Sequence, residues 1–405
     1  MQVQSPREGI FGRIYGVPEE LGSGTRRRLE GSEGVWVLVG AVESGGRGVQ
    51  FMLLGLGVPA VRRLRVQVCA MASSAPSPMH KGGGPCFAGV DCGTNSTRLL
   101  VLDAQGKTLA REMQITRLGQ GVDATGRLAD EAIGRVCACL EEYRRILESH
   151  DPDAVREGRI RASATSAARD AENSAEFFAR AEAALGARPE LLPGAEEGRL
   201  SFLGATDALP VSDGMTQGEQ ATIAVVDLGG GSTEVCVGSR SRVDALKVVS
   251  CQMGSVRLAE RFLWETDPPS KDALDAAAGA VRQVLQEAAP KLEGISDASL
   301  LVGVAGTVSA TTRLVKKLEG EYDKDKIHHS VLHLDQIEAT LADLAGKTHA
   351  ERIATVGMEA KRADVILGGL VTLVELMKFF KFDRLLTSEN DILDGLAASV
   401  LEKHK

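Results

Sequence analysis

Residues Thr222–Gly238 read TIAVVDLGGGSTEVCVG, and this stretch predicts the fold. An apolar run ends at Asp227, and three glycines and two hydroxyl residues follow before Glu234 opens a second apolar run. The pattern predicts a buried strand, a tight glycine turn and a returning strand. Glycines let main-chain N–H groups approach an anion closely and form a concave nest, although an ordinary Gly-rich hairpin is equally typical of the pattern. The residues predicted to bind the anion are Gly229, Gly230, Gly231, Ser232 and Thr233.

A second stretch, Ala88–Val101, reads AGVDCGTNSTRLLV and repeats this pattern. Asp91 aligns with Asp227, and both copies share D-x-G-x-x-S-T between apolar runs. Two such copies indicate a duplicated domain, in which two phosphate-holding hairpins face one cleft. The donors predicted from the first copy are Gly93, Thr94, Asn95 and Ser96.

The composition is typical of a soluble globular protein, with 43% apolar and 25% charged residues among 405. This length is enough for two or three domains. The net charge of −8 does not favour nonspecific binding of nucleic acid, and an aromatic content of 4% argues against base-stacking platforms. Seven cysteines without a CxxC pair predict free thiols in a reducing cytoplasm.

Residues 1–85 differ from the rest because they are rich in Gly and Arg and lack sustained periodicity. Their longest uncharged apolar segment, Gly48–Val61, is too short to span a bilayer. We expect either a disordered extension or a biological start downstream, at Met71 or Met79. The following chain alternates strands and helices, which is typical of α/β layers. The two predicted domains are residues 86–215 and 216–405.

Several residues suggest phosphate chemistry. Two carboxylates beside phosphate are unfavourable unless a divalent cation lies between them, so Asp91 and Asp227 predict a Mg²⁺ site. Hydrolysis also needs a base that activates water, and the two adjacent glutamates of GAEEGRLSFLG are candidates, or else partners of a helix dipole. Arg98 and Arg169 can neutralise phosphoryl oxygens or form surface ion pairs. Gly306–Thr307 is a further anion contact or a simple strand-to-helix turn.

Six motifs, taken in order, resemble the Ppx/GppA phosphatase family, which comprises exopolyphosphatases and guanosine pentaphosphate phosphohydrolases. They are VDCGTNSTRLLV, SATSAARDAEN, GAEEGRLSFLG, VVDLGGGSTE, MGSVRLAERF and RADVILGG. The resemblance covers about residues 86–400. It implies an α/β fold with two ribonuclease-H-like domains of the actin-like, sugar-kinase and Hsp70 superfamily around a central cleft. It also implies that Glu197 activates water, that Arg169 is catalytic and that Glu234 helps bind the metal.

Two motifs depart from the family pattern. Val356-Gly357-Met358 stands where Pro-Gly-Met is frequent. Near the C-terminus, where Gly-Leu-Arg-Asp-Gly is common, this chain reads Asp391-Ile392-Leu393-Asp394-Gly395, so no role of that arginine is carried over. The chain resembles the short form of the family, without the extra helical region of longer members.

The resemblance implies an exopolyphosphatase that hydrolyses terminal phosphate from inorganic polyphosphate with Mg²⁺ or Mn²⁺. The first alternative is hydrolysis of guanosine pentaphosphate (pppGpp), for which the sequence offers no obvious stacking residue. A sugar- or acetate-type kinase would need an Asp in place of Glu197, and intact Asp91, Asp227 and Glu197 argue against a non-catalytic alarmone-binding regulator. We expect a cytoplasmic enzyme without nucleic-acid or membrane partners, and a homodimer stays open.

Overall fold

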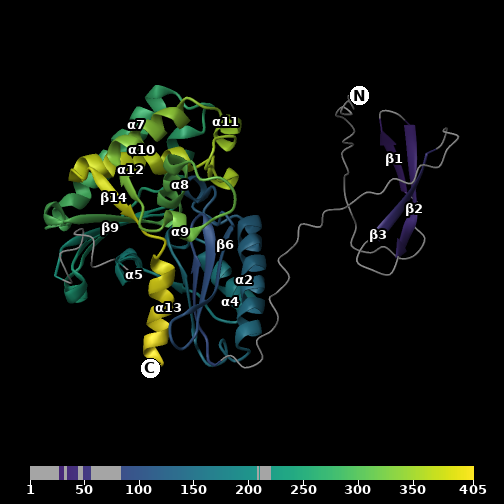
Figure 1. Ribbon diagram of the computed structural model, residues 1–405, viewed down its shortest axis with the longest axis horizontal. Coiled ribbons are helices and arrows are strands. Elements are labelled where there is room, and N and C mark those ends of the chain that lie inside the picture. Colours follow the sequence, from purple (N-terminus) through teal and green to yellow (C-terminus); the bar gives the residue numbers. More distant parts are fainter. Residues whose placement is uncertain (1–26, 32–33, 44–48, 56–83, 208, 210–219) are drawn as a thin grey trace, which may run out of the picture. The chain divides into compact units, whose positions relative to one another are not determined.

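The computed structural model describes residues 27–31, 34–43, 49–55, 84–207, 209 and 220–405. The chain forms two units, Met1–Met79 and His80–Lys405. The first unit contains one antiparallel sheet (Figure 1), made of β1 (Arg27–Gly31), β2 (Gly34–Glu43) and β3 (Val49–Gly55). These strands are not predicted from the sequence because the segment lacks sustained periodicity. The rest of residues 1–83 lies outside the described residues, so the expected disorder or downstream start stays a prediction.

The first sheet of the second unit has the strand order β6-β5-β4-β7-β8. Its first three strands form an antiparallel meander, and the other two continue in parallel. The strands are β4 (Phe87–Cys92), β5 (Ser96–Leu102), β6 (Thr108–Ile115), β7 (Ile160–Ala164) and β8 (Glu190–Leu191). The helices that follow them are α1 (Val122–Thr125), α2 (Asp130–His150), α3 (Ser166–Asp170) and α4 (Ser174–Leu185).

The second sheet has the order β11-β10-β9-β12-β14-β13 and begins on the same plan, with an antiparallel meander that continues into the parallel strands β12 and β14. It differs at its edge, where β13 pairs antiparallel with β14. Its strands are β9 (Ile223–Leu228), β10 (Thr233–Gly238), β11 (Lys247–Cys251), β12 (Leu300–Val304), β13 (Val331–His333) and β14 (Arg384–Thr387). Its helices are α6 (Ser255–Leu258), α7 (Lys271–Ala288), α8 (Ala305–Lys316), α9 (Lys324–Ile327), α10 (Leu334–Ala345), α11 (His349–Ile353) and α12 (Ile366–Phe380). No helix of the described ranges is both long and apolar enough to cross a bilayer.

Two helices cross between the halves. Helix α5 (Gly194–Asp207) follows the first sheet in the chain, yet its Phe202 packs in a core with strands of the second sheet. Helix α13 (Ile392–Lys403) follows the second sheet, yet its Leu393 packs on Leu100 of the first. Figure 1 shows yellow α13 beside the blue strands of the first sheet. The domain boundary predicted at 215/216 stays a prediction, and the packing of both helices crosses it.

The crossing brings the two helices into backbone contact because glycines occupy the contact points. A Cβ atom on Gly204 of α5 would lie 1.9 Å from the carbonyl oxygen of Asp391. A Cβ atom on Gly395 of α13 would lie 2.4 Å from the carbonyl oxygen of Leu200. Any larger residue at either position must therefore push the two helices apart.

We expect Gly395→Ala to destabilise the fold by about 1–3 kcal/mol, because the new methyl group overlaps rigid backbone. The control is Gly279→Ala in α7, where the nearest atom to a new Cβ is an arginine nitrogen 3.9 Å away. In an open helix position, alanine is favoured over glycine by up to about 1 kcal/mol. Thermal unfolding of both variants tests the constraint, and equal melting temperatures would contradict it.

Candidate active site

Both predicted glycine turns line one cleft of about 570 Å³, a volume that includes space open to solvent. The predicted residues that line it are Asp91, Gly93, Thr94, Asn95, Ser96, Arg98, Glu197, Asp227, Gly229, Gly230, Gly231 and Ser232. Thr233 does not line the cleft: it is fully buried, and its hydroxyl donates to the carbonyl oxygen of Met253 at 2.5 Å. Glu234 and Arg169 lie behind the cleft wall and contact its residues, as described below.

The two turns have the same backbone geometry. Gly93 N–H donates to the carbonyl oxygen of Ser96 at 2.9 Å, and Gly229 N–H donates to that of Ser232 at 3.1 Å. These two N–H groups therefore close the turns. The next two N–H groups of each turn donate to no acceptor in the described part of the chain: Thr94, Asn95, Gly230 and Gly231. Residues with unpaired N–H groups thus line one cleft, an arrangement that suits an anion. The phosphate-binding role of these residues stays a prediction.

The start of α6 fixes the second turn from behind. The carbonyl oxygen of Gly229 accepts from Ser255 N–H at 3.0 Å, and that of Gly230 accepts from Val256 N–H at 2.9 Å. Gly254 is needed here because a Cβ atom would lie 2.5 Å from the Gly230 carbonyl oxygen. The motif MGSVRL thus engages the carbonyl oxygens of the turn and leaves its N–H groups to the cleft.

Glu197 lies in the first turn of α5 and is 7% exposed. Its Oε2 accepts a hydrogen bond from Arg169 Nη1 at 2.6 Å, and the same nitrogen donates to the carbonyl oxygen of Leu192 at 2.8 Å. Burial raises the pKa of Glu197 well above its usual range, the charge of Glu234 raises it further, and Arg169 acts in the opposite direction. A carboxylate with a raised pKa at the cleft wall is suited to accept a proton near neutral pH.

Glu234 is 1% exposed and supports the cleft from behind. Its Oε1 accepts hydrogen bonds from the hydroxyls of Ser232 and Ser250 at 2.9 and 2.6 Å, and lies 3.9 Å from Arg169 Nη2. Burial raises the pKa of Glu234, and the two serine hydroxyls partly offset this rise. These contacts orient Ser232 and Arg169, and all of them engage Oε1 of Glu234.

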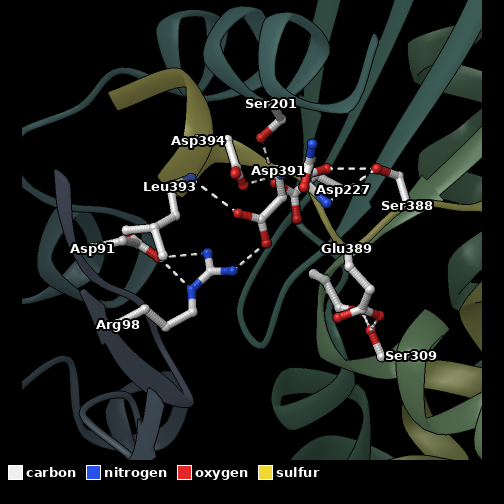
Figure 2. Close-up of polar contacts among 12 residues, drawn as sticks. Asp91, Arg98, Ser201, Asp227, Ser309, Ser388, Glu389, Asp391, Leu393 and Asp394 are labelled. Carbon is white, nitrogen blue, oxygen red and sulfur yellow. Dashed lines mark hydrogen bonds and ion pairs between the residues drawn. The ribbon is translucent and has the colours of Figure 1, made fainter. Parts of the chain in front are cut away.

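Asp91 and Asp227 occupy matching positions but have different partners. Asp91 Oδ2 accepts from Arg98 Nε and Nη2 at 3.2 and 2.7 Å, and Arg98 Nη1 also donates to Asp391 (Figure 2). Asp227 Oδ2 accepts from the hydroxyl of Ser201, and its Oδ1 has no hydrogen-bond donor among the described residues. Burial, followed by the charges of Asp391 and Glu234, raises the pKa of Asp227 to about 7.

The predicted metal ligands Asp91, Asp227 and Glu234 are not gathered round one point. Among the described residues, no group of three or more His, Cys, Asp or Glu side chains is arranged to hold a metal ion. Mg²⁺, however, often binds one or two carboxylates and completes its shell with water and substrate phosphate. A cation of this kind fits the free Oδ1 of Asp227 and a cleft in which buried carboxylates outnumber guanidinium groups. The metal role of all three residues stays a prediction.

Several residues of the cleft are not among the site residues predicted from the sequence. Arg362 lines the cleft and lies against Gly306, where a Cβ atom would come within 2.1 Å of its Nη1. Ser166 also lines the cleft, and its buried hydroxyl has no hydrogen-bond partner among the described residues. Arg362 is the first residue of the motif RADVILGG, so the motif could have predicted it as a site residue. For Ser166, the sequence offers only its polar neighbours. Gly306 and Thr307, a predicted anion contact, both line the cleft.

A second hollow of about 240 Å³ shares Thr94 and Asn95 with the cleft. It is also lined by Trp264, which is 45% exposed and whose Nε1 donates to the carbonyl oxygen of Asp364 at 3.0 Å. Arg117 lies beside it and forms an ion pair with Asp364 at 2.9 Å. The structure therefore provides an exposed aromatic ring next to the cleft, which the sequence analysis did not identify.

Comparisons with known proteins show which family this chain resembles. The pattern of the Ppx/GppA phosphatase family matches residues 101–404. Exopolyphosphatase 2 of Mycobacterium tuberculosis is 40% identical over 329 residues, which cover 77% of this chain and 98% of that protein. A guanosine-5'-triphosphate,3'-diphosphate pyrophosphatase of Vibrio parahaemolyticus is 28% identical over 327 residues, which cover 80% of this chain and 60% of that protein.

A solved structure has the same fold. The crystal structure of an exopolyphosphatase-like protein is 34% identical with a TM-score of 0.73, and the match covers 79% of this chain and 100% of that one. The likeness confirms the predicted α/β fold, in which two sheets flank the cleft. The family pattern and the relative at 40% identity also confirm the predicted hydrolase class at the level of the family. This chain belongs to the Ppx/GppA phosphatase family.

Proposed function

We propose that the protein is an exopolyphosphatase, which removes the terminal phosphate of inorganic polyphosphate. The observation that carries the proposal is the position of Glu197: a buried carboxylate with a raised pKa in the wall of a cleft lined by two anion-binding turns. The relative named Exopolyphosphatase 2, with 40% identity over nearly its whole length, supports the same substrate.

In the proposed reaction, the unpaired N–H groups of both turns and the guanidinium of Arg98 bind the phosphate chain. Glu197 takes a proton from a water molecule, whose oxygen forms a bond to the terminal phosphorus. The bridging P–O bond breaks, and orthophosphate and a chain one phosphate shorter leave. Arg169 fixes the orientation of Glu197 through the 2.6 Å hydrogen bond, and the turn N–H groups stabilise the charge that develops on the phosphoryl oxygens.

A divalent cation, Mg²⁺ or Mn²⁺, fits this scheme through the carboxylates of Asp227 and Asp91. When bound, it would neutralise charge on the phosphoryl oxygens. The cleft favours such a cation because its buried carboxylates outnumber its guanidinium groups. The carboxylates are Asp91, Asp227, Glu197, Glu234 and Asp391, and the guanidinium groups are Arg98, Arg169 and Arg362.

A second candidate substrate is pppGpp. The hollow beside Trp264 favours it because an exposed indole can stack on a guanine while the attached phosphates enter the cleft through Thr94 and Asn95. The relative from Vibrio parahaemolyticus, named for activity on this nucleotide, supports the same alternative. Phosphate release from long-chain polyphosphate and from pppGpp, measured side by side with and without Mg²⁺, separates the two.

We expect Glu197→Gln to lower kcat on polyphosphate by about 10²–10⁴-fold, because the amide cannot accept the proton of the attacking water. Glu196→Gln is the matched control: the adjacent carboxylate forms exposed ion pairs with Arg161 and Arg199 and does not line the cleft. Phosphate release by both variants checks the assignment. Full activity of Glu197→Gln would show that another group activates the water.

We expect Asp227→Asn to stabilise the protein more at pH 8 than at pH 5. The pKa of Asp227 rises from 3.8 to about 7 on folding, so the folded chain binds this proton more tightly and loses stability as pH rises through that interval. Asparagine removes the buried charge and can still accept from Ser201. Melting temperatures at both pH values check this, at about 2–4 °C per kcal/mol. Asp272→Asn, at an exposed position of α7, is the control, and the same shift in both variants would contradict the prediction.

We expect Trp264→Ala to raise the KM for pppGpp about 5- to 100-fold if the indole stacks on the base, since such a contact contributes about 1–3 kcal/mol. The KM for polyphosphate, which has no base, should stay within about twofold of that of the wild type. Ile353→Ala, which removes an exposed apolar side chain that lines neither hollow, is the control. An equal rise of both KM values would exclude stacking.

A further inference from the structure

Asp391, which no site prediction includes, contacts a cleft residue from the far end of the chain. Its Oδ2 accepts a hydrogen bond from Nη1 of Arg98, which lies 293 positions earlier. The other side of the same guanidinium donates from Nε and Nη2 to Asp91 Oδ2 at 3.2 and 2.7 Å. Figure 2 shows the guanidinium between the two carboxylates. Arg98 is thus bound by one carboxylate of each half of the duplicated fold.

These contacts determine which donors of Arg98 remain for a ligand. A guanidinium has five N–H groups in a rigid plane. Asp91 and Asp391 together accept from three of them, so one N–H on Nη1 and one on Nη2 remain. Arg98 lines the cleft, and its side chain is 17% exposed. The two carboxylates therefore fix the plane in which the remaining N–H groups reach the cleft.

Asp391 is itself held rigidly at the N-terminus of α13. Its Oδ1 accepts from Leu393 N–H at 2.9 Å, and its own N–H donates to Asp394 Oδ2 at 2.9 Å. Asp394 in turn accepts two hydrogen bonds from Arg111 of β6, both at 2.9 Å. Arg111 thus supplies the cation beside this helix start. Position 393, where an arginine is common in the family, is filled by a leucine that is 1% exposed.

Helix capping alone does not require a carboxylate at position 391. Asparagine and serine cap helices about as well as aspartate. Stability is also a weak explanation, because the desolvation of a buried ion pair offsets most of its attraction. Asp391 is 4% exposed, so this cost applies in full. We therefore expect the role of the Asp391 carboxylate to lie in its contact with Arg98.

We propose that Asp391 is a positioning residue that holds Arg98 in the orientation in which it binds the phosphate chain; this inference rests on the proposed function. Without Asp391, Nη1 of Arg98 loses its acceptor, and Asp91 holds the guanidinium only along its Nε–Nη2 edge. The guanidinium can then pivot about that edge, and its remaining N–H groups leave the orientation in which they reach the cleft. Asp391 thus acts on the substrate through Arg98 and does not touch it.

The test is a double-mutant cycle with Asp391→Asn and Arg98→Gln. Asparagine keeps the helix cap and removes the charge that binds Arg98. We expect Asp391→Asn alone to weaken the binding of inorganic tripolyphosphate, measured by calorimetry, about 10- to 100-fold, as for loss of a hydrogen bond to a charged group. The kcat/KM on polyphosphate should fall by a similar factor. In the Arg98→Gln background, Asp391→Asn should change both values by less than about twofold.

Asp394→Asn is the matched control, because its amide oxygen can still accept from the Asp391 N–H and the lost charge faces Arg111 instead of Arg98. We expect binding within about twofold of that of the wild type. If Asp391→Asn does not fold, Asp391→Ser, which also caps helices, takes its place. Three results would overturn the inference. The first is that Asp391→Asn binds tripolyphosphate as tightly as the wild type, and the second is that Asp391→Asn weakens binding as much in the Arg98→Gln background as in the wild type. The third is that Asp394→Asn weakens binding as much as Asp391→Asn does. A wild-type protein that binds tripolyphosphate without releasing phosphate would refute the proposed function alone, because the binding cycle still tests the role of Asp391.

Discussion

The rest of the structure depends on the backbone contact between α5 and α13. Gly204 and Gly395 let the two helices approach so closely that no side chain fits between them. Each half has a large core of its own, and each helix also packs against the sheet of the other half through smaller apolar clusters. Both helices begin at the cleft, and their first residues bring Glu197 and Asp391 to the glycine turns. The packing that stabilises the fold thus also brings the candidate active site together.

The fold buries several carboxylates around the cleft, and this burial changes their pKa values. Burial raises the pKa of four of the carboxylates around it, and the two arginines only partly compensate. Asp391 is the exception: burial would raise its pKa too, but Arg98 and Arg111 keep it below the usual value. Perturbed carboxylates of this kind gather where a protein binds or transforms a ligand, because the fold alone gains nothing from them.

The duplicated sequence does not produce a symmetrical site. The two turns close in the same way and present the same N–H groups, as expected from a shared motif. Their aspartates nevertheless differ, since the side chain of Asp91 is paired with Arg98, whereas that of Asp227 accepts a hydrogen bond only from the Ser201 hydroxyl within the described part of the chain. The position that corresponds to Arg98 in the second copy is Glu234, which faces two serines and Arg169. One copy therefore carries an ion pair, and the other keeps a free carboxylate oxygen at the cleft.

By itself, the sequence determined the two hairpins, the α/β class, the family and most of the residues that line the cleft. These features depend on local patterns, in which apolar runs and glycines specify strands and turns over a few residues. The same pattern overextended the anion site to Thr233, because successive residues of a strand point to opposite faces. Only the tertiary structure decided that Asp391 binds Arg98, that Ser201 binds Asp227 and that Trp264 lies beside the cleft. Such contacts join residues that are far apart in the chain, and only the crossing of α5 and α13 and the packing of the two sheets bring them together.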